Sequence, residues 1–78
     1  MIRCPKCNKE LSLDEIDLTV QLKNGEIDCI FGCDLIEEEY YRENVVKILQ
    51  IEHIDPNCLH SWEVNIDMNN FLEMIKAV

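Results

Sequence analysis

Two cysteines separated by two residues lie near the start of the chain, in the stretch RCPKCN over residues 3–8. A C-x-x-C turn is tight enough for both sulfurs to reach one metal ion, at about 2.3 Å each from a zinc. Pro5 sets the backbone for this turn, and Asn8 tolerates the left-handed conformation that such turns often need. Because a structural zinc has four protein ligands, the pair Cys4 and Cys7 predicts further ligands elsewhere in the chain.

The chain is short enough to need such a metal. A single core in a protein of 78 residues rarely contributes more than about 3–5 kcal/mol to stability. We expect one domain over residues 1–78, with a metal-bearing part over 1–33 and an α+β part over 34–78. Five cysteines, no signal-peptide pattern and no long apolar run favour a cytoplasmic protein whose reduced thiols bind metal.

Alternating apolar residues over 16–31 predict a β-hairpin. The apolar positions are every second residue over 16–22, and then Ile27, Cys29 and Phe31. Asn24-Gly25 between the two runs is typical of a two-residue hairpin turn. A loop of this length would direct both apolar runs to one face of the hairpin. The predicted pairs are Leu22 with Ile27, Val20 with Cys29, Leu18 with Phe31 and Ile16 with Cys33.

The remaining residues predict a mixture of helices and strands. Acidic residues at the start of 34–44 favour a short helix there. The β-branched residues of 45–54 favour a strand, although their spacing also allows a helix, and 61–66 alternates as a half-buried strand. An amphipathic helix follows over 68–78. The expected fold class is α+β, with a metal-bearing hairpin unit, a short helix, a second antiparallel β pair and a C-terminal amphipathic helix.

The second ligand pair is best sought in CIFGC, residues 29–33. Gly32 permits a backbone bend that would bring Cys29 and Cys33 to one ion. If the strand instead stayed extended to Phe31, these two cysteines would lie about 13 Å apart, too far for one tetrahedral ion. A replacement ligand would then come from Cys58, His60 or His53. The predicted set is one structural zinc bound by Cys4, Cys7, Cys29 and Cys33.

The order of a knuckle, a hairpin and a second cysteine pair resembles that of a zinc ribbon over residues 3–33, RCPKCNKEL…NGEIDCIFGC. The second pair has three intervening residues, where zinc ribbons usually have two. The N-terminal stretch is also weakly similar to Com-type phage zinc fingers, which bind RNA in translational control. The resemblance implies one structural zinc and, for the Com-type proteins, a nucleic-acid-binding role.

The charge of the chain points to a different partner. Sixteen acidic residues against seven basic ones give a net charge of −9, which repels nucleic acid and acidic membranes and attracts basic proteins. In size and charge the chain resembles phage-encoded inhibitors of nucleic-acid-binding machinery, which would mimic DNA. The candidate acidic patch consists of Glu26, Asp28, Glu37, Glu38, Glu39 and Glu43.

Two other roles remain open at this stage. A nucleic-acid-binding regulator of transcription or translation would use the basic residues Arg3, Lys6, Lys9 and Lys23, but no aromatic residue interleaves with them as single-stranded binders require. A subunit would use an exposed strand edge to join an assembly or to form a homodimer. We expect no enzyme activity, because neither an H-E-x-x-H metal motif nor a nucleotide-binding glycine pattern is present.

Overall fold

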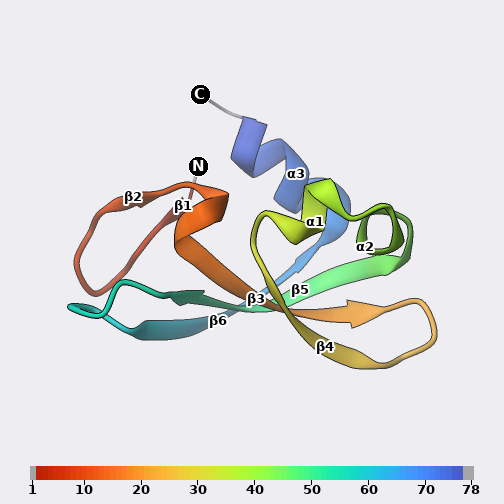
Figure 1. Cartoon of the computed structure of the whole chain (residues 1–78), viewed down its shortest axis with the longest axis horizontal. Helices are drawn as coiled ribbons and strands as arrows, with labels where there is room; N and C mark the ends of the chain where they lie inside the picture. The colour runs from red at the N-terminus through yellow and green to blue at the C-terminus, as the bar shows by residue number, and fades with distance from the viewer. Residues whose placement is uncertain (1, 77–78) are drawn as a thin grey trace.

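A four-stranded antiparallel sheet forms the centre of the structure, which is a computed structural model that describes residues 2–76 (Figure 1). Its strands are β3 (Ile16–Leu22), β4 (Ile27–Phe31), β5 (Val45–His53) and β6 (His60–Asp67). They lie in the order β4-β3-β5-β6, so β4 and β6 form the two edges. The prediction of a hairpin followed by a second antiparallel pair is confirmed.

A second, two-stranded sheet carries the cysteine turn. It consists of β1 (Ile2–Arg3) and β2 (Glu10–Leu11), which are antiparallel. A short 3-10 helix, η1 (Leu13–Glu15), leads from β2 into β3. This small sheet lies at one end of the molecule, beside the loop that joins β5 to β6 (Figure 1).

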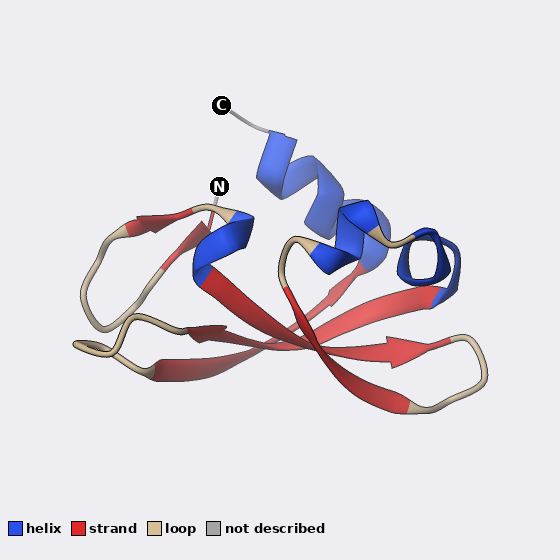
Figure 2. Ribbon diagram, in the orientation of Figure 1, coloured by secondary structure: helices blue, strands red, loops and turns tan. Residues whose placement is uncertain are grey.

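The three α-helices all lie on one side of the large sheet (Figures 1 and 2). They are α1 (Asp34–Glu37), α2 (Glu39–Asn44) and α3 (Met68–Lys76). The sequence predicts one helix over 34–44, but Glu38 has an extended backbone and separates α1 from α2. The C-terminal helix is confirmed up to residue 76, and residues 77–78 of that prediction lie outside the described part. Within residues 2–76, no helix is both long enough and apolar enough to cross a membrane.

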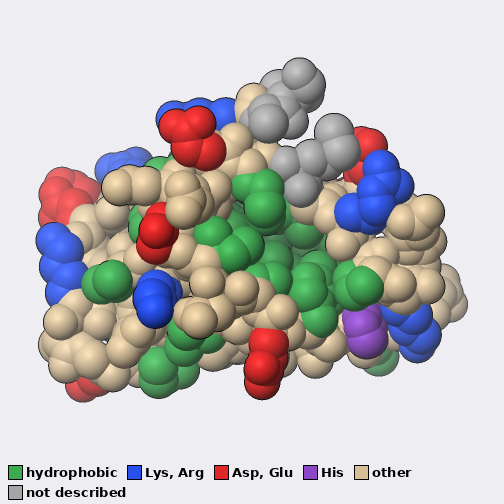
Figure 3. All heavy atoms as spheres, turned by 180° about the vertical axis from the view of Figure 1, so that it is seen from behind, with side chains coloured by type: hydrophobic (Ala, Val, Ile, Leu, Met, Phe, Trp, Pro, Cys, Tyr) green, Lys and Arg blue, Asp and Glu red, His purple; other side chains and the backbone are tan. Residues whose placement is uncertain are grey.

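The core lies between the sheet and these helices. Alternate residues of β3 are completely buried at Ile16, Leu18 and Val20, and they meet Leu35 of α1 and Phe71 of α3 in one apolar cluster. Partly buried apolar side chains of β6 and α3 complete the edge of this core. Figure 3 shows hydrophobic side chains gathered in the middle of the rear surface. Within the described residues, no helix lies on the opposite face of the sheet.

The β3–β4 hairpin has a different register from the one that the sequence predicts. The backbone N–H of Leu22 donates to Glu26 O at 2.8 Å, and Gln21 pairs with Ile27. The loop therefore has three residues and ends on Gly25, whose φ of +88° is the left-handed conformation that this loop type needs. The predicted pairing of Leu22 with Ile27 is wrong by one residue.

A shift of one residue turns every side chain of a strand to the opposite face. Ile27 and Phe31 consequently point away from the core and are 56% and 38% exposed, and Cys29 is also exposed. Ile30 occupies the inward position and is only 5% exposed. The expectation that Ile27, Cys29 and Phe31 face the core is therefore wrong.

Candidate metal centre

Four potential metal ligands meet at the end of the molecule where the small sheet contacts the β5–β6 loop. The ligand atoms of Cys4, Cys7, His53 and Cys58 all lie within 4.8 Å of one another. Cys4 Sγ is 3.6 Å from Cys58 Sγ, and Cys7 Sγ is 3.6 Å from His53 Nδ1. These residues are positioned to bind one metal ion.

The distances agree with a tetrahedral ion. Metal–sulfur bonds of about 2.3 Å and metal–nitrogen bonds of about 2.05 Å give ligand separations of about 3.8 Å between two sulfurs and about 3.6 Å between sulfur and nitrogen. Both 3.6 Å contacts lie close to these values. The remaining pairs of ligand atoms lie within 4.8 Å of one another, so shifts of up to about 1 Å would bring all four groups onto an ion.

The first half of the centre is the turn between β1 and β2. The backbone N–H of Asn8 donates to Cys4 O at 2.8 Å, and the N–H of Cys4 donates to Lys9 O at 3.0 Å. Asn8 has a φ of 63°, the left-handed conformation that the sequence predicts for it. Pairing of Ile2 with Leu11 closes the base of this turn.

The second half comes from the end of β5 and the loop that follows. His53 is the last residue of β5, and Asp55 organises the loop after it. The Asp55 carbonyl accepts hydrogen bonds from the N–H groups of Cys58 and Leu59, both at 2.9 Å, and its side chain accepts one from Asn57 N–H. This compact turn brings the Cys58 sulfur back toward His53.

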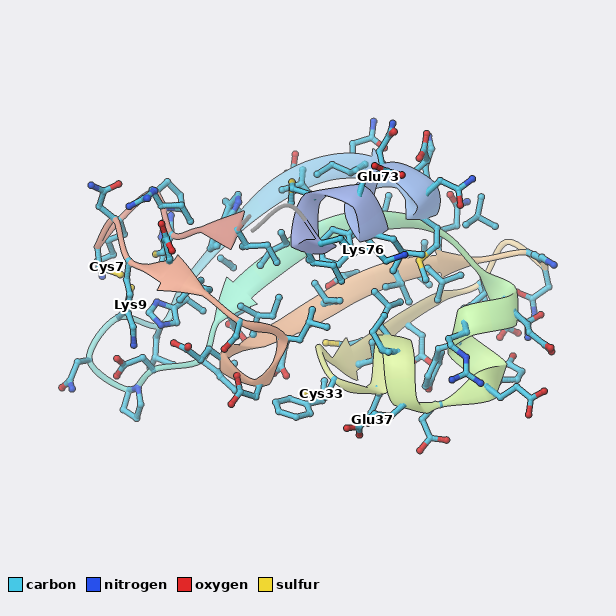
Figure 4. The ribbon with its side chains drawn as sticks, turned by 90° about the horizontal axis from the view of Figure 1, so that it is seen from above. Cys7, Lys9, Cys33, Glu37, Glu73 and Lys76 are labelled. Atoms are coloured by element: carbon cyan, nitrogen blue, oxygen red, sulfur yellow. The ribbon has the colours of Figure 1, made fainter. Side chains whose placement is uncertain are left out.

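Lys6 links the two halves directly. Its ammonium donates to the carbonyl of Cys58 at 3.1 Å. Cys4, His53 and Cys58 are buried, and Cys7 is exposed at the rim. Figure 4 shows Cys7 and Lys9 together at this end of the molecule, well separated from Cys33 and Glu37.

The surroundings of Cys4 favour the thiolate that a metal requires. Burial alone would raise the pKa of Cys4, but the backbone N–H groups of Cys7 and Lys6, with contacts from His53 and Cys58, lower that pKa to about 6. Burial and the neighbouring Cys4 and Cys7 raise the pKa of Cys58 to about 11. The Cys4 thiol therefore loses its proton readily and can bind a cation. Binding of a cation would in turn displace the proton of Cys58.

The second ring nitrogen of His53, Nε2, is buried and has no hydrogen-bond partner among the described residues 2–76. A histidine that binds metal through one nitrogen usually donates the other N–H to a carboxylate, a carbonyl or water. An adjacent open cavity of about 420 Å³ supplies room for water and the carboxylates of Asp14, Glu15 and Asp55. The fit of a metal at His53 rests on Nδ1, which lies 3.6 Å from Cys7 Sγ and within the cluster of four ligand atoms.

The structure joins Cys4 and Cys7 but does not bring Cys29 and Cys33 to them. Cys29 lies exposed on β4, which stays extended as far as Phe31, the condition under which one ion cannot reach both later cysteines. Cys33 directly precedes α1 and is only partly exposed. His53 and Cys58 take the places that the sequence assigns to this second pair.

The sequence signal for these two ligands is weak but present. His53 and Cys58 flank the Asp55-Pro56-Asn57 turn with four residues between them, which is a compact ligand spacing. His60, the third alternative, is not in the cluster, and its ring stacks on Trp62 with centroids 5.8 Å apart.

Five of the six residues of the predicted acidic patch are exposed, and Asp28 is partly buried. The exposed residues lie at the β3–β4 turn and on or between α1 and α2. Asp28 instead points to the helix side of the sheet, where its carboxylate accepts a hydrogen bond from the Tyr41 hydroxyl at 3.1 Å. It also accepts one from the backbone N–H of Cys29 at 2.9 Å.

The basic residues near the cysteine turn are already engaged. Arg3 forms an ion pair with Glu10 at 3.0 Å, and Lys9 forms one with Glu15 at 3.0 Å. Together with the contact from Lys6 to the Cys58 carbonyl, these interactions occupy all three cations of the turn. Carboxylates balance the charges of Arg3 and Lys9, whereas Lys6 keeps its charge.

No protein-family model matches the chain, and no curated protein or solved structure matches it either. Function is therefore inferred from the metal cluster and from the distribution of surface charge.

Proposed function

We propose that this domain binds one structural zinc ion through Cys4, Cys7, His53 and Cys58 and acts as a non-enzymatic binding protein. The observation that carries the metal proposal is the convergence of these four ligand atoms within 4.8 Å from two segments more than 40 residues apart. A tetrahedral set of three thiolates and one imidazole is typical of zinc rather than of other divalent metals.

The ligand set supports a structural role for the zinc. Catalytic zinc sites keep one coordination position free for water or substrate, whereas here the protein supplies four ligands. Three of the four are buried. A structural zinc contributes about 10–16 kcal/mol apparent at neutral pH in finger peptides, more than a core of this size provides. The ion would fasten the β1–β2 turn to the β5–β6 loop.

The partner that we propose is a basic protein surface, such as that of a nucleic-acid-binding protein. A net charge of −9 attracts such a surface and speeds association with it at low salt. By occupying sites that another protein uses for phosphates, the carboxylates would make the domain an inhibitor or regulator. The pairing of Arg3 and Lys9 with carboxylates argues against the alternative of direct nucleic-acid binding.

Metal content and nucleic-acid binding can be tested on one preparation. Native mass spectrometry should find one zinc per chain, and removal with a chelator should abolish the dispersed amide spectrum of the folded protein. Fluorescence anisotropy with single-stranded and duplex oligonucleotides at physiological ionic strength should show no binding tighter than about 10⁻⁴ M, the weak end of non-specific binding. A metal-free protein that remains folded would refute the zinc proposal, and tight oligonucleotide binding would refute the choice of partner.

A further inference from the structure

One face of the four-stranded sheet is bare, because α1, α2 and α3 all lie on the other side (Figures 1 and 2). The strand register fixes which outward side chains are neighbours on this face, since directly opposed residues point to the same side. Three rows cross it: Ile27–Gln21–Lys47–Asp67, Cys29–Thr19–Gln50–Glu63 and Phe31–Asp17–Glu52–Ser61. We call this surface the open sheet face.

Two carboxylates stand directly opposite each other on the open sheet face. Asp17 of β3 pairs with Glu52 of β5, and like charges in this position destabilise a sheet. Among residues 2–76 neither carboxylate forms an ion pair, and Lys47, the one basic residue in the three rows, lies in the row farthest from theirs. This pair of carboxylates does not stabilise the sheet. A cation from outside the domain would relieve the repulsion between them.

The space between the carboxylates can receive such a cation. A hollow of about 240 Å³ is lined by Asp17, Thr19, Cys29, Gln50 and Glu52. This volume equals about eight water molecules in the liquid, which is room for one long side chain. Its lining is uncharged apart from the two carboxylates.

Apolar side chains lie two residues before and after Cys29, the residue of β4 that lines the hollow. Ile27 is 56% exposed and Phe31 is 38% exposed, and both lie in the outward rows. β4 is also an edge strand, so a further extended segment can lie beside it. The open sheet face thus joins an acidic hollow to an apolar margin.

We propose that the open sheet face docks a protein segment that carries a lysine or arginine next to apolar residues. The cation lies between Asp17 and Glu52, and the apolar residues lie against Ile27 and Phe31. This inference rests on the proposed function, in which the partner is a basic protein, and it names the surface used. A second copy of the chain suits the face poorly, because two such faces would bring two Asp17–Glu52 pairs together.

The test uses the zinc-loaded domain and a synthetic peptide, acetyl-VTKTVT-amide, whose valines and lysine share one face of an extended segment, with acetyl-VTETVT-amide as the acidic control. Amide shifts in ¹⁵N–¹H spectra at physiological ionic strength should concentrate in the three rows of the open sheet face. The double variant Asp17→Asn/Glu52→Gln should bind the basic peptide about fivefold more weakly, within the range of two partly exposed ion pairs. The matched variant Glu37→Gln/Glu38→Gln removes the same charge from the α1 end and should lose about twofold at most.

The variants preserve shape, and their folding is checked by the dispersion of the same spectra, with Glu52→Gln alone as a milder second variant. Two results would refute the open sheet face as the docking surface while leaving the proposal of a basic partner in place. One is binding of the basic peptide with shifts centred on α1 and α2, and the other is an equal loss of peptide affinity in Glu37→Gln/Glu38→Gln. Equal binding of both peptides, or of neither, would overturn the basic partner as well. Concentration-dependent shifts in the three rows without peptide would assign the face to a second copy and reject the proposal.

Discussion

Replacing Cys58 with serine removes one of the four candidate ligands while keeping almost the same side-chain volume. The size of the effect follows from the free energy that a structural zinc contributes to folding. Structural zinc contributes about 10–16 kcal/mol apparent at neutral pH, so each of four ligands accounts for about 2.5–4 kcal/mol. At 1.4 kcal/mol per factor of ten, Cys58→Ser should weaken zinc binding about 60- to 700-fold.

The loss should also appear as a loss of stability. At a zinc concentration well above the Kd of both proteins, the unfolding free energy falls by the same 2.5–4 kcal/mol, or about 10–30 °C in Tm for a domain of this size. Competition with a chelating indicator gives the zinc Kd, and thermal circular dichroism gives Tm. Cys29→Ser is the matched control, because Cys29 is exposed on β4 and outside the cluster. Its Kd should change by about twofold at most, as for an ordinary surface substitution.

The two variants separate the ligand set found in the structure from the one that the sequence predicts. Equal weakening in Cys29→Ser and Cys58→Ser would show that both cysteines influence the metal and would refute the cluster geometry. A Cys58→Ser protein with unchanged zinc affinity would refute it more directly.

Three further predictions concern other parts of the fold. Gly32→Ala should lose about 1–3 kcal/mol of stability in urea unfolding, because a Cβ there would lie 2.2 Å from Leu13 O, and wild-type stability would contradict this packing. Tyr41→Phe should lose about 0.5–1.5 kcal/mol through its bond to Asp28, and a neutral result would mean that water replaces the hydroxyl. Burial and nearby carboxylates raise the pKa of Cys33, so less thiolate is present at a given pH. Its alkylation, followed by site-resolved mass spectrometry, should therefore reach half-maximal rate at higher pH in the folded protein than in the unfolded one, and equal midpoints would contradict this.

The hairpin shows how far local sequence determines this fold. Alternation over 16–22 and the Asn24-Gly25 pair predict two antiparallel strands, and the structure confirms them. The register depends on whether both turn residues adopt a positive φ, and only Gly25 does. This backbone conformation makes the loop three residues long and turns Ile27 and Phe31 outward. The amino-acid composition of the turn does not reveal which conformation it adopts.

The metal cluster shows a different limit. Cys4 and Cys7 are recognisable because a C-x-x-C turn is a local structure whose geometry follows from its spacing. His53 and Cys58 join them only because β5 runs antiparallel to β3 and ends beside the β1–β2 turn. Such an encounter is set by strand order and length, so the sequence names His53 and Cys58 among its candidate ligands but does not show that they lie beside Cys4 and Cys7.

The ligand set itself is the most direct test of this account. Zinc K-edge X-ray absorption on the zinc-loaded protein counts sulfur and nitrogen neighbours and measures their distances. The cluster of Cys4, Cys7, His53 and Cys58 predicts three sulfurs at about 2.3 Å and one nitrogen at about 2.0–2.1 Å. Four sulfurs, or a light-atom neighbour without the outer-shell scattering of an imidazole ring, would contradict it.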